Sequence, residues 1–196
     1  PIVDVIIFDE AHQLPELASS YFSQTISSRQ LLELITDIKI ADREEAGDIQ
    51  QLEGELAKFE KEIRDVRLVF GREDKRLNWL EVWENSLLSV ELTKMMISFQ
   101  IVLDILETAS QRGKLLDNCW QRAKAHYNYI DIYIETNNEE SIRWIEIRGH
   151  HLYLNHTPVN ISETFQKRLS EYNATSIFTS ATLAINDDFD YYTGQL

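Results

Sequence analysis

The chain has 196 residues, a length that fits one large domain or two small ones. Its composition, 43% hydrophobic and 27% charged, is usual for a globular protein. The formal net charge of −14 argues against a protein that grips nucleic acid by bulk electrostatics, because neutralising phosphates requires Lys and Arg. The single cysteine, Cys119, excludes an internal disulfide and a cysteine metal cluster.

Targeting signals are the next property to weigh. No uninterrupted apolar run approaches the roughly 20 residues of a membrane span, and no signal peptide is recognisable. A cytoplasmic protein without a membrane partner is therefore expected. The chain begins at Pro1, without Met, directly before an apolar strand, which favours a piece of a longer protein.

The stretch Val5–Phe8 is uninterruptedly apolar and ends abruptly at Asp9 and Glu10. Such a run is typical of a parallel strand buried on both faces. Because ligands of open α/β sheets bind beyond the carboxyl ends of the strands, the two acids stand where nucleotide phosphates and a metal would lie. The first acid of such a site holds Mg²⁺, and the second can orient or deprotonate the attacking water. The alternative is a strand that ends in a solvated acidic turn.

Two helices are predicted next. Gln13-Leu14-Pro15-Glu16 opens a short helix that runs to about Phe22, with Pro15 acceptable in its first turn. Ser27 starts a second helix, and Gln30 stands three residues later, as in a capping box. The apolar face of this second helix consists of Leu31, Leu34, Ile35 and Ile38, and residues 42–48 are expected to be a charged connection.

The clearest periodic signal is a pair of heptad seams. Apolar residues alternate spacings of three and four, the pattern of a long helix that packs side by side with another. A polar turn over residues 71–75 and a second helical stretch around Trp79 and Trp83 separate the seams, which favours an antiparallel helical hairpin over a self-associating coiled coil. The first seam is Ile49, Leu52, Leu56, Phe59, Ile63, Val66 and Phe70, and the second is Leu88, Leu92, Met95, Phe99, Val102 and Leu106.

The remaining elements follow from caps and alternation. A helix is expected from Leu115 to about Ile134, a turn at Asn137-Asn138, and a β-hairpin of residues 142–147 and 152–154 around Arg148-Gly149-His150. Asn160 can cap a helix that ends near Glu171, and residues 174–183 form a second short apolar strand that ends in hydroxyl side chains. The fold is therefore predicted to be mainly α (α+β): a helical bundle with a heptad-seamed hairpin, a β-hairpin, and two short strands of a parallel α/β sheet.

One modest basic patch lies in the last long helix. Its members could contact DNA, with the tyrosines stacking on bases, but a solvated helix face with an aromatic core side is the alternative that we favour. The patch consists of Arg112, Lys114, Arg122, Lys124 and His126, with Tyr127 and Tyr129 nearby.

Two motifs carry a resemblance to a known family. Asp9-Glu10-Ala11-His12 and Thr179-Ser180-Ala181-Thr182, each after an apolar strand, resemble motifs II and III of superfamily 2 helicases. The long helical segment between them is similar to the Arch insertion of the XPD/DinG group of iron–sulfur helicases. Within that group the chain most resembles the bacterial DinG-type branch, in particular its YoaA-like members, through residues 9–15, 27–32 and 179–183.

The resemblance implies roles for the matching residues. Asp9 resembles the acid that holds Mg²⁺ through water, and Glu10 the carboxylate that activates water for attack on the γ-phosphate of ATP. The remaining matches, His12, Thr179, Ser180 and Thr182, resemble the link between nucleotide state and DNA engagement. The resemblance implies residues 1–26 and 158–196 as parts of the first motor domain and residues 27–157 as an Arch-like insertion.

The resemblance also implies a larger parent protein. No G-x-x-x-x-G-K-[ST] loop is present, so the piece alone is expected to be inactive as an ATPase and helicase. In the parent, the resemblance implies ATP and Mg²⁺ as cofactors, a 4Fe–4S cluster held upstream, 5′-to-3′ unwinding of single-stranded or forked DNA, and a replication or repair protein as partner. The open alternatives are a superfamily 2 RNA helicase with an unusual insertion and a non-enzymatic helical interaction module.

Overall fold

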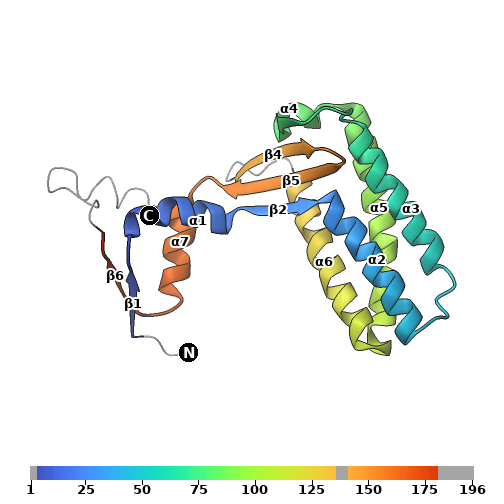
Figure 1. Ribbon diagram of the computed structural model, residues 1–196, viewed down its shortest axis with the longest axis horizontal. Helices are drawn as coiled ribbons and strands as arrows, with labels where there is room; N and C mark the ends of the chain where they lie inside the picture. The colour runs from blue at the N-terminus through green and yellow to red at the C-terminus, as the bar shows by residue number, and fades with distance from the viewer. Residues whose placement is uncertain (1–3, 136–140, 181–196) are drawn as a thin grey trace. The chain divides into compact units, whose positions relative to one another are not determined.

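The computed structural model describes residues 4–135 and 141–180, which divide into two compact units (Figure 1). Unit 1 comprises residues 1–24, 138–142 and 156–196, and unit 2 comprises residues 25–137 and 143–155. Helices predominate, with a few strands, which confirms the mainly α (α+β) class. The elements are β1 (Val5–Phe8), η1 (Ala11–Gln13), α1 (Leu14–Phe22), β2 (Gln24–Ser27), α2 (Ser28–Glu45), α3 (Leu52–Leu68), β3 (Lys75–Asn78), α4 (Trp79–Trp83), α5 (Ser86–Ala109), η2 (Ser110–Arg112), α6 (Lys114–Ile134), β4 (Ser141–Arg148), β5 (His151–Pro158), α7 (Ile161–Ser170) and β6 (Thr175–Phe178).

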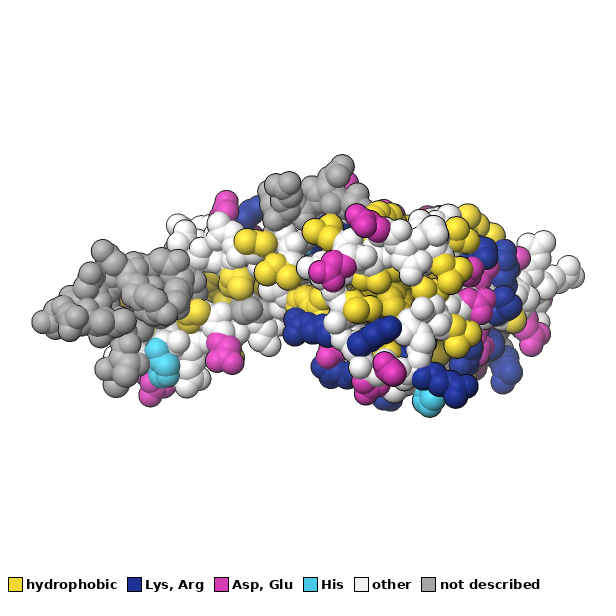
Figure 2. All heavy atoms as spheres, turned by 90° about the horizontal axis from the view of Figure 1, so that it is seen from above, with side chains coloured by type: hydrophobic (Ala, Val, Ile, Leu, Met, Phe, Trp, Pro, Cys, Tyr) yellow, Lys and Arg dark blue, Asp and Glu magenta, His cyan; other side chains and the backbone are white. Residues whose placement is uncertain are grey.

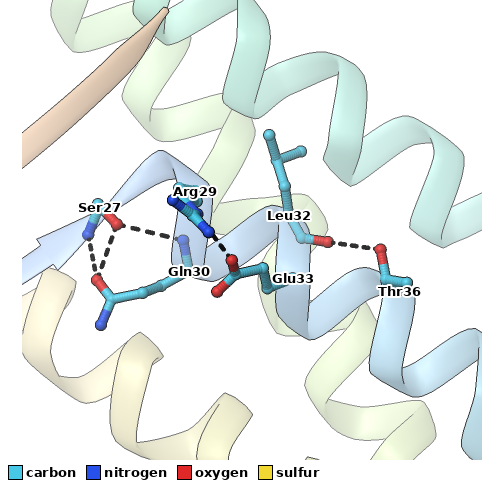
Figure 3. A network of polar contacts seen from close by, with 6 residues as sticks. All are labelled: Ser27, Arg29, Gln30, Leu32, Glu33 and Thr36. Atoms are coloured by element: carbon cyan, nitrogen blue, oxygen red, sulfur yellow. Dashed lines mark hydrogen bonds and ion pairs between the residues drawn. The ribbon is translucent and has the colours of Figure 1, made fainter. Parts of the chain in front are cut away.

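Helix α2 begins at the predicted residue because a complete capping box holds its first turn (Figure 3). The Gln30 amide donates to Ser27 Oγ at 3.2 Å, and the Ser27 amide donates to Gln30 Oε1 at 2.8 Å. The helix continues to Glu45, so the prediction of a connection from Asp42 onward was wrong for its first four residues. Charged residues suit a solvated last turn, which Asp42 closes by accepting a hydrogen bond from the Ala46 amide at 2.9 Å. The predicted apolar face is buried at Leu31, Leu34, Ile35 and Ile38.

Helices α3 and α5 form the antiparallel hairpin that the two seams predict. Phe59 stacks on Phe99 with ring centroids 4.4 Å apart, and the Ser98 hydroxyl donates to the Glu62 carboxylate. Glu62 follows Phe59 on α3, whereas its partner Ser98 precedes Phe99 on α5, so the two helices run in opposite directions. Ile49 lies before α3 and is half-buried, whereas every other predicted seam residue is buried. The predicted helical stretch around Trp79 and Trp83 forms as α4, and the connection also contains β3, which was not predicted.

Helix α5 is unusually apolar. The stretch Ser86–Arg112 is long and apolar enough to match a membrane span in length and composition, which corrects the expectation drawn from uninterrupted apolar runs. The core helix of a folded domain passes the same test, and α5 has that environment because nine of its side chains are buried in unit 2. The buried side chains are Leu88, Leu92, Met95, Met96, Ser98, Phe99, Val102, Leu106 and Ala109.

Helices α2 and α6 complete the bundle beside α3 and α5 (Figure 1). Helix α6 packs against both α5 and α2. The Glu45 carboxylate at the end of α2 caps the start of α6, because it accepts hydrogen bonds from the amides of Leu115 at 2.9 Å and Leu116 at 2.8 Å. A carboxylate at this position satisfies amides that an α-helix leaves unpaired and opposes the positive end of its dipole. Glu45 therefore ties two helices that are distant in sequence.

The predicted β-hairpin is confirmed as β4 and β5, joined by a turn in which Gly149 has a φ of 55°. It is the centre of a four-stranded sheet with the order β2-β5-β4-β3, and the two outer strands were not predicted. Strand β3 pairs antiparallel with β4, with Lys75 opposite Ile147. One side of the hairpin joins the helical core through Ile145, Ile147, Leu152 and Leu154.

Unit 1 contains the two strands that the sequence assigns to a parallel sheet. Strands β1 and β6 pair in parallel, with Val5 opposite Thr175 and Phe8 opposite Phe178, and helices α1 and α7 pack together. Phe8 stacks on Phe178 at a centroid distance of 5.1 Å. The prediction that β1 is buried on both faces was wrong: Val5 is 48% exposed and Ile7 65% exposed, since the described elements of unit 1 leave that face of the strand uncovered.

Candidate active site at the tips of two parallel strands

The register of β1 and β6 places the two predicted motifs side by side. Parallel strands end at the same edge of a sheet, so the residues after Phe8 and Phe178 emerge together. The ladder extends past the strands, because the Thr179 amide donates to the Phe8 carbonyl at 2.9 Å and the Ala11 amide donates to the Thr179 carbonyl at 2.9 Å. Backbone bonds thus fix the positions from which Asp9, Glu10 and Ser180 project.

Asp9 is held by two donors. Its Oδ1 accepts a hydrogen bond from the Thr179 hydroxyl at 2.8 Å and another from the Glu10 amide at 3.0 Å. Hydrogen bonds to an ionised carboxylate are stronger than those between neutral groups, so they restrict its rotation. The Thr179 hydroxyl therefore orients the Asp9 carboxylate.

Glu10 occupies a left-handed backbone conformation, with φ 50° and ψ 44°. This conformation costs a non-glycine residue about 1–2 kcal/mol, and such outliers concentrate at functional sites. Here it joins β1 to η1, and the side chain stays exposed. The strained turn presents the second carboxylate at the strand edge.

His12 joins both motifs. Its Nδ1 lies 2.8 Å from Ser180 Oγ and 3.3 Å from Glu10 Oε2. Whether His12 Nδ1 or Ser180 Oγ donates in this hydrogen bond depends on the imidazole tautomer. The structure thus brings together Asp9, Glu10, His12, Thr179 and Ser180, whereas Thr182 lies outside the described residues.

The arrangement suits a metal that takes most of its ligands from elsewhere. Within residues 4–135 and 141–180, no group of three or more His, Cys, Asp and Glu side chains is placed to hold a metal ion. Mg²⁺ is commonly bound through one or two carboxylates, with waters and substrate phosphates as its other ligands. Asp9 with its oriented oxygen fits such a site, and Glu10 beside it fits a base or a water-positioning group.

The predicted basic patch is largely neutralised. Arg112 Nη1 lies 2.5 Å from Asp48 Oδ1, and Arg122 Nη1 lies 2.6 Å from Asp37 Oδ2. Lys124 stands over the Trp120 ring at 5.3 Å, and Lys114 is exposed at the start of α6. Over unit 2, Figure 2 shows Lys and Arg side chains interspersed with Asp and Glu. This pairing favours a solvated helix face over a surface that attracts phosphates.

The two tyrosines of the patch are directed into unit 2. The Tyr127 ring meets Phe99 edge-on at 5.6 Å, and the Tyr129 hydroxyl donates to the Leu154 carbonyl at 3.1 Å. Burial raises the pKa of both phenols. It lowers the pKa of the neighbouring His126 imidazole, because removal from water disfavours its cationic form. This packing matches the aromatic core side of the helix.

Ala11 is a position beside this site that the sequence did not single out. Its side chain is fully buried, and its amide forms the hydrogen bond that joins the turn after β1 to Thr179. The sequence signal for this position is a small residue between an acid and a histidine. That pattern alone does not distinguish a residue whose amide bonds a second strand from a residue of an ordinary turn.

No protein-family model matches the chain. It is 36% identical over 196 residues to a protein named ATP-dependent DNA helicase YoaA from Escherichia coli. It is 34% identical over 197 residues to the protein of the same name from Haemophilus influenzae. Both matches cover the whole chain.

Over its entire length the chain is similar to part of these two proteins named ATP-dependent DNA helicase YoaA. It spans 31% of the length of each of these relatives. Both strand tips and the helical unit between them therefore fall within the region shared with YoaA.

Proposed function

We propose that this chain is the Arch-containing part of an ATP-dependent DNA helicase of the YoaA type. Residues 1–26 and 158–196 supply pieces of its first motor domain, and residues 27–157 supply the Arch-like insertion. The observation that carries the proposal is the direct pairing of the strand tips, Asp9 with Thr179 and His12 with Ser180. The parent hydrolyses ATP and unwinds DNA in the 5′-to-3′ direction, and the piece alone does neither.

The nucleotide end of the proposed site consists of Asp9 and Glu10. Asp9 would hold Mg²⁺ through water, and the Thr179 hydroxyl keeps the carboxylate in a single orientation. A metal held there would supply positive charge opposite the transferring phosphoryl group. Glu10 orients the attacking water and accepts its proton at Oε, a role that its exposed position at the strand edge permits.

The coupling end consists of His12, Thr179 and Ser180. A change at Glu10 reaches His12 directly, because Glu10 Oε2 and Ser180 Oγ both lie within 3.3 Å of the same imidazole nitrogen. A shift of the proton on His12 changes which neighbour it can bond. Ser180 follows β6, so that change makes or breaks a side-chain contact between the turn after β1 and the residues after β6. Nucleotide state is transmitted to the DNA-engaging parts of the parent along this route.

The uncovered face of β1 and β6 supports a larger motor domain. Val5, Ile7 and Ile177 are large apolar side chains, and each is more than 40% exposed. An apolar run of this kind is normally buried on both faces in a parallel sheet. The remaining parts of the motor domain cover this face in the parent.

The rest of the proposal concerns partners. The parent uses ATP and Mg²⁺, holds a 4Fe–4S cluster outside this chain, and acts on single-stranded or forked DNA with a replication or repair protein in the bacterial cytoplasm. The Arch confines a DNA strand sterically, and the motor domains supply the grip. Its net negative charge and the paired Arg112 and Arg122 support this division.

Replacing Thr179 and Ser180 by Ala in the full-length parent tests the coupling. ATP hydrolysis stimulated by single-stranded DNA should be reduced but persist, because Asp9 keeps its bond from the Glu10 amide and Glu10 is unchanged, while unwinding of a forked duplex is lost. Thr179→Ser is the matched control, since it keeps the hydroxyl that bonds Asp9, and it should unwind normally. Intact unwinding by the double Ala variant would refute the proposed link.

A further inference from the structure

Helix α5 carries a second apolar stripe that is not part of its buried seam. Leu87 is 55% exposed, Val90 49% and Ile97 56%. Their spacings of three and seven residues place them on one side of the helix. The buried seam already joins α5 to the core, so this outer stripe contributes little to the hairpin.

The stripe leads into an open groove between α5 and α6. The groove has a volume of about 450 Å³, and most of its lining is apolar. Tyr127 of α6 lines the groove, and its ring is edge-on to the buried Phe99. The apolar lining consists mainly of Trp83, Met96, Ile97, Ile101, Tyr127 and Ile134.

Two carboxylates border the groove. Asp131 is part of its lining, and Asp104 accepts a hydrogen bond at 2.7 Å from Gln100, which also lines it. The negative charges of Asp131 and Asp104 add to burial in raising the pKa of Tyr127. Lys124, on α6, is held over the Trp120 ring, and Lys94, on α5, is ion-paired with Glu91. The groove therefore combines an apolar lining with Asp131, and Asp104 follows Gln100 by one turn of α5.

We propose that this groove binds a cationic amphipathic α-helix of a partner protein. The helix inserts apolar residues between α5 and α6 and places Lys or Arg beside Asp104 and Asp131. Leu87, Val90, Ile97 and Ile101 follow α5 for about 21 Å, or about four helical turns, and Lys94, which is ion-paired with Glu91, lies among them. A second copy of this chain fits less well, since it brings a second acidic border against the first. The site lies wholly in unit 2, so it does not depend on the proposed ATP chemistry.

Fluorescence anisotropy tests the proposal with the 196-residue chain and a labelled synthetic helix of about 18 residues. The probe carries Leu at helical spacings of three and four, with Lys on the flanks. One comparison peptide replaces each Lys by Glu, and another scrambles the order so that no apolar stripe forms. The Lys helix should bind at least about tenfold more tightly than either comparison peptide. Equal binding of the Glu helix or the scrambled peptide would overturn the proposal.

Two variants with the same added charge distinguish binding in the groove from general electrostatic attraction of the peptide to the acidic chain. Ile97→Asp and Leu68→Asp each add one negative charge at an exposed apolar position, but only Ile97 lines the groove. Ile97→Asp should weaken binding about tenfold or more, because an apolar side chain is lost from the interface. Leu68→Asp should leave binding unchanged or slightly tighter. Equal affinities of the two variants would place the peptide elsewhere.

Two further measurements complete the test. Asp104→Asn with Asp131→Asn should weaken binding at low salt and reduce its dependence on salt. Val90→Asp is a second stripe variant in case Ile97→Asp melts early in circular dichroism, and it should weaken binding likewise. Concentration-dependent self-association of the chain that Ile97→Asp abolishes would assign the groove to a second copy and contradict the proposal.

Discussion

The register of the α3–α5 hairpin makes a sharp prediction at Phe99. This side chain is fully buried, stacks on Phe59 at 4.4 Å and meets Tyr127 edge-on at 5.6 Å. Phe99→Ala removes most of a buried aromatic ring and leaves a cavity, which costs about 3–5 kcal/mol of unfolding free energy. With a urea dependence of about 2 kcal/mol per molar, the unfolding midpoint should fall by about 2 M.

Tryptophan fluorescence is a suitable assay, because all four tryptophans lie in unit 2. Ile97→Ala is the matched control, two residues away on the same helix but 56% exposed. It should change the unfolding free energy by less than about 0.5 kcal/mol. In a double-mutant cycle, Phe99 and Phe59 should show a coupling of about 1 kcal/mol. Equal losses for Phe99→Ala and Ile97→Ala would mean that the seam does not face α3, and the hairpin assignment would fail.

Two other predictions concern strain and pH. Glu10→Gly should relieve the strain of the left-handed backbone, whereas Glu10→Ala should keep it. The amides of Ala11 and Thr179 should therefore exchange hydrogen about fivefold more slowly in Glu10→Gly than in Glu10→Ala, a difference of about 1 kcal/mol. Equal exchange in the two variants would contradict the strain. Burial lowers the pKa of His126 below its ordinary 6.5, so the unfolded chain takes up the proton first. The stability that this group contributes is complete above about pH 6.5 and is lost as pH falls through its folded-state pKa. The difference in urea midpoint between wild type and His126→Gln should therefore shrink from about pH 7.5 to about pH 5.5, and a constant difference would refute this contribution.

The sequence predicted the helical parts of the fold well because their signals are local. The seam from Leu52 to Phe70 and the seam from Leu88 to Leu106 mark buried positions directly. The Ser27–Gln30 box and the Asn160 cap fix two helix starts, and both form as expected, with Asn160 Oδ1 accepting from the Glu163 amide at 3.1 Å.

The parts that sequence alone missed depend on partners far along the chain. Strand β3 is four residues long and mostly polar, so only its pairing with β4 reveals it. Glu45 gives no local sign of capping α6. Ile7 is exposed, whereas the apolar run around it predicts a strand that is buried on both faces. These features arise from tertiary contacts, or from their absence among the described residues.

The residues of the candidate site could be predicted from the sequence, but their detailed contacts could not. The acids and hydroxyls were identified through motif resemblance, and parallel pairing implies that they lie close together. The bond from Thr179 to Asp9 and the left-handed turn at Glu10 could not be predicted, because apolar periodicity carries no information on side-chain rotamers or on the backbone conformation of a single residue.

The central claim is tested most directly by ATP hydrolysis of the full-length parent, with and without single-stranded DNA, comparing wild type with Glu10→Gln. If Glu10 activates water, the variant should lose about 10²–10⁴-fold in stimulated turnover while ATP binding persists. Such a loss would support a motor of which this chain forms the Arch-containing part. Equal rates in the two proteins, or no stimulated hydrolysis by the wild type, would contradict the account.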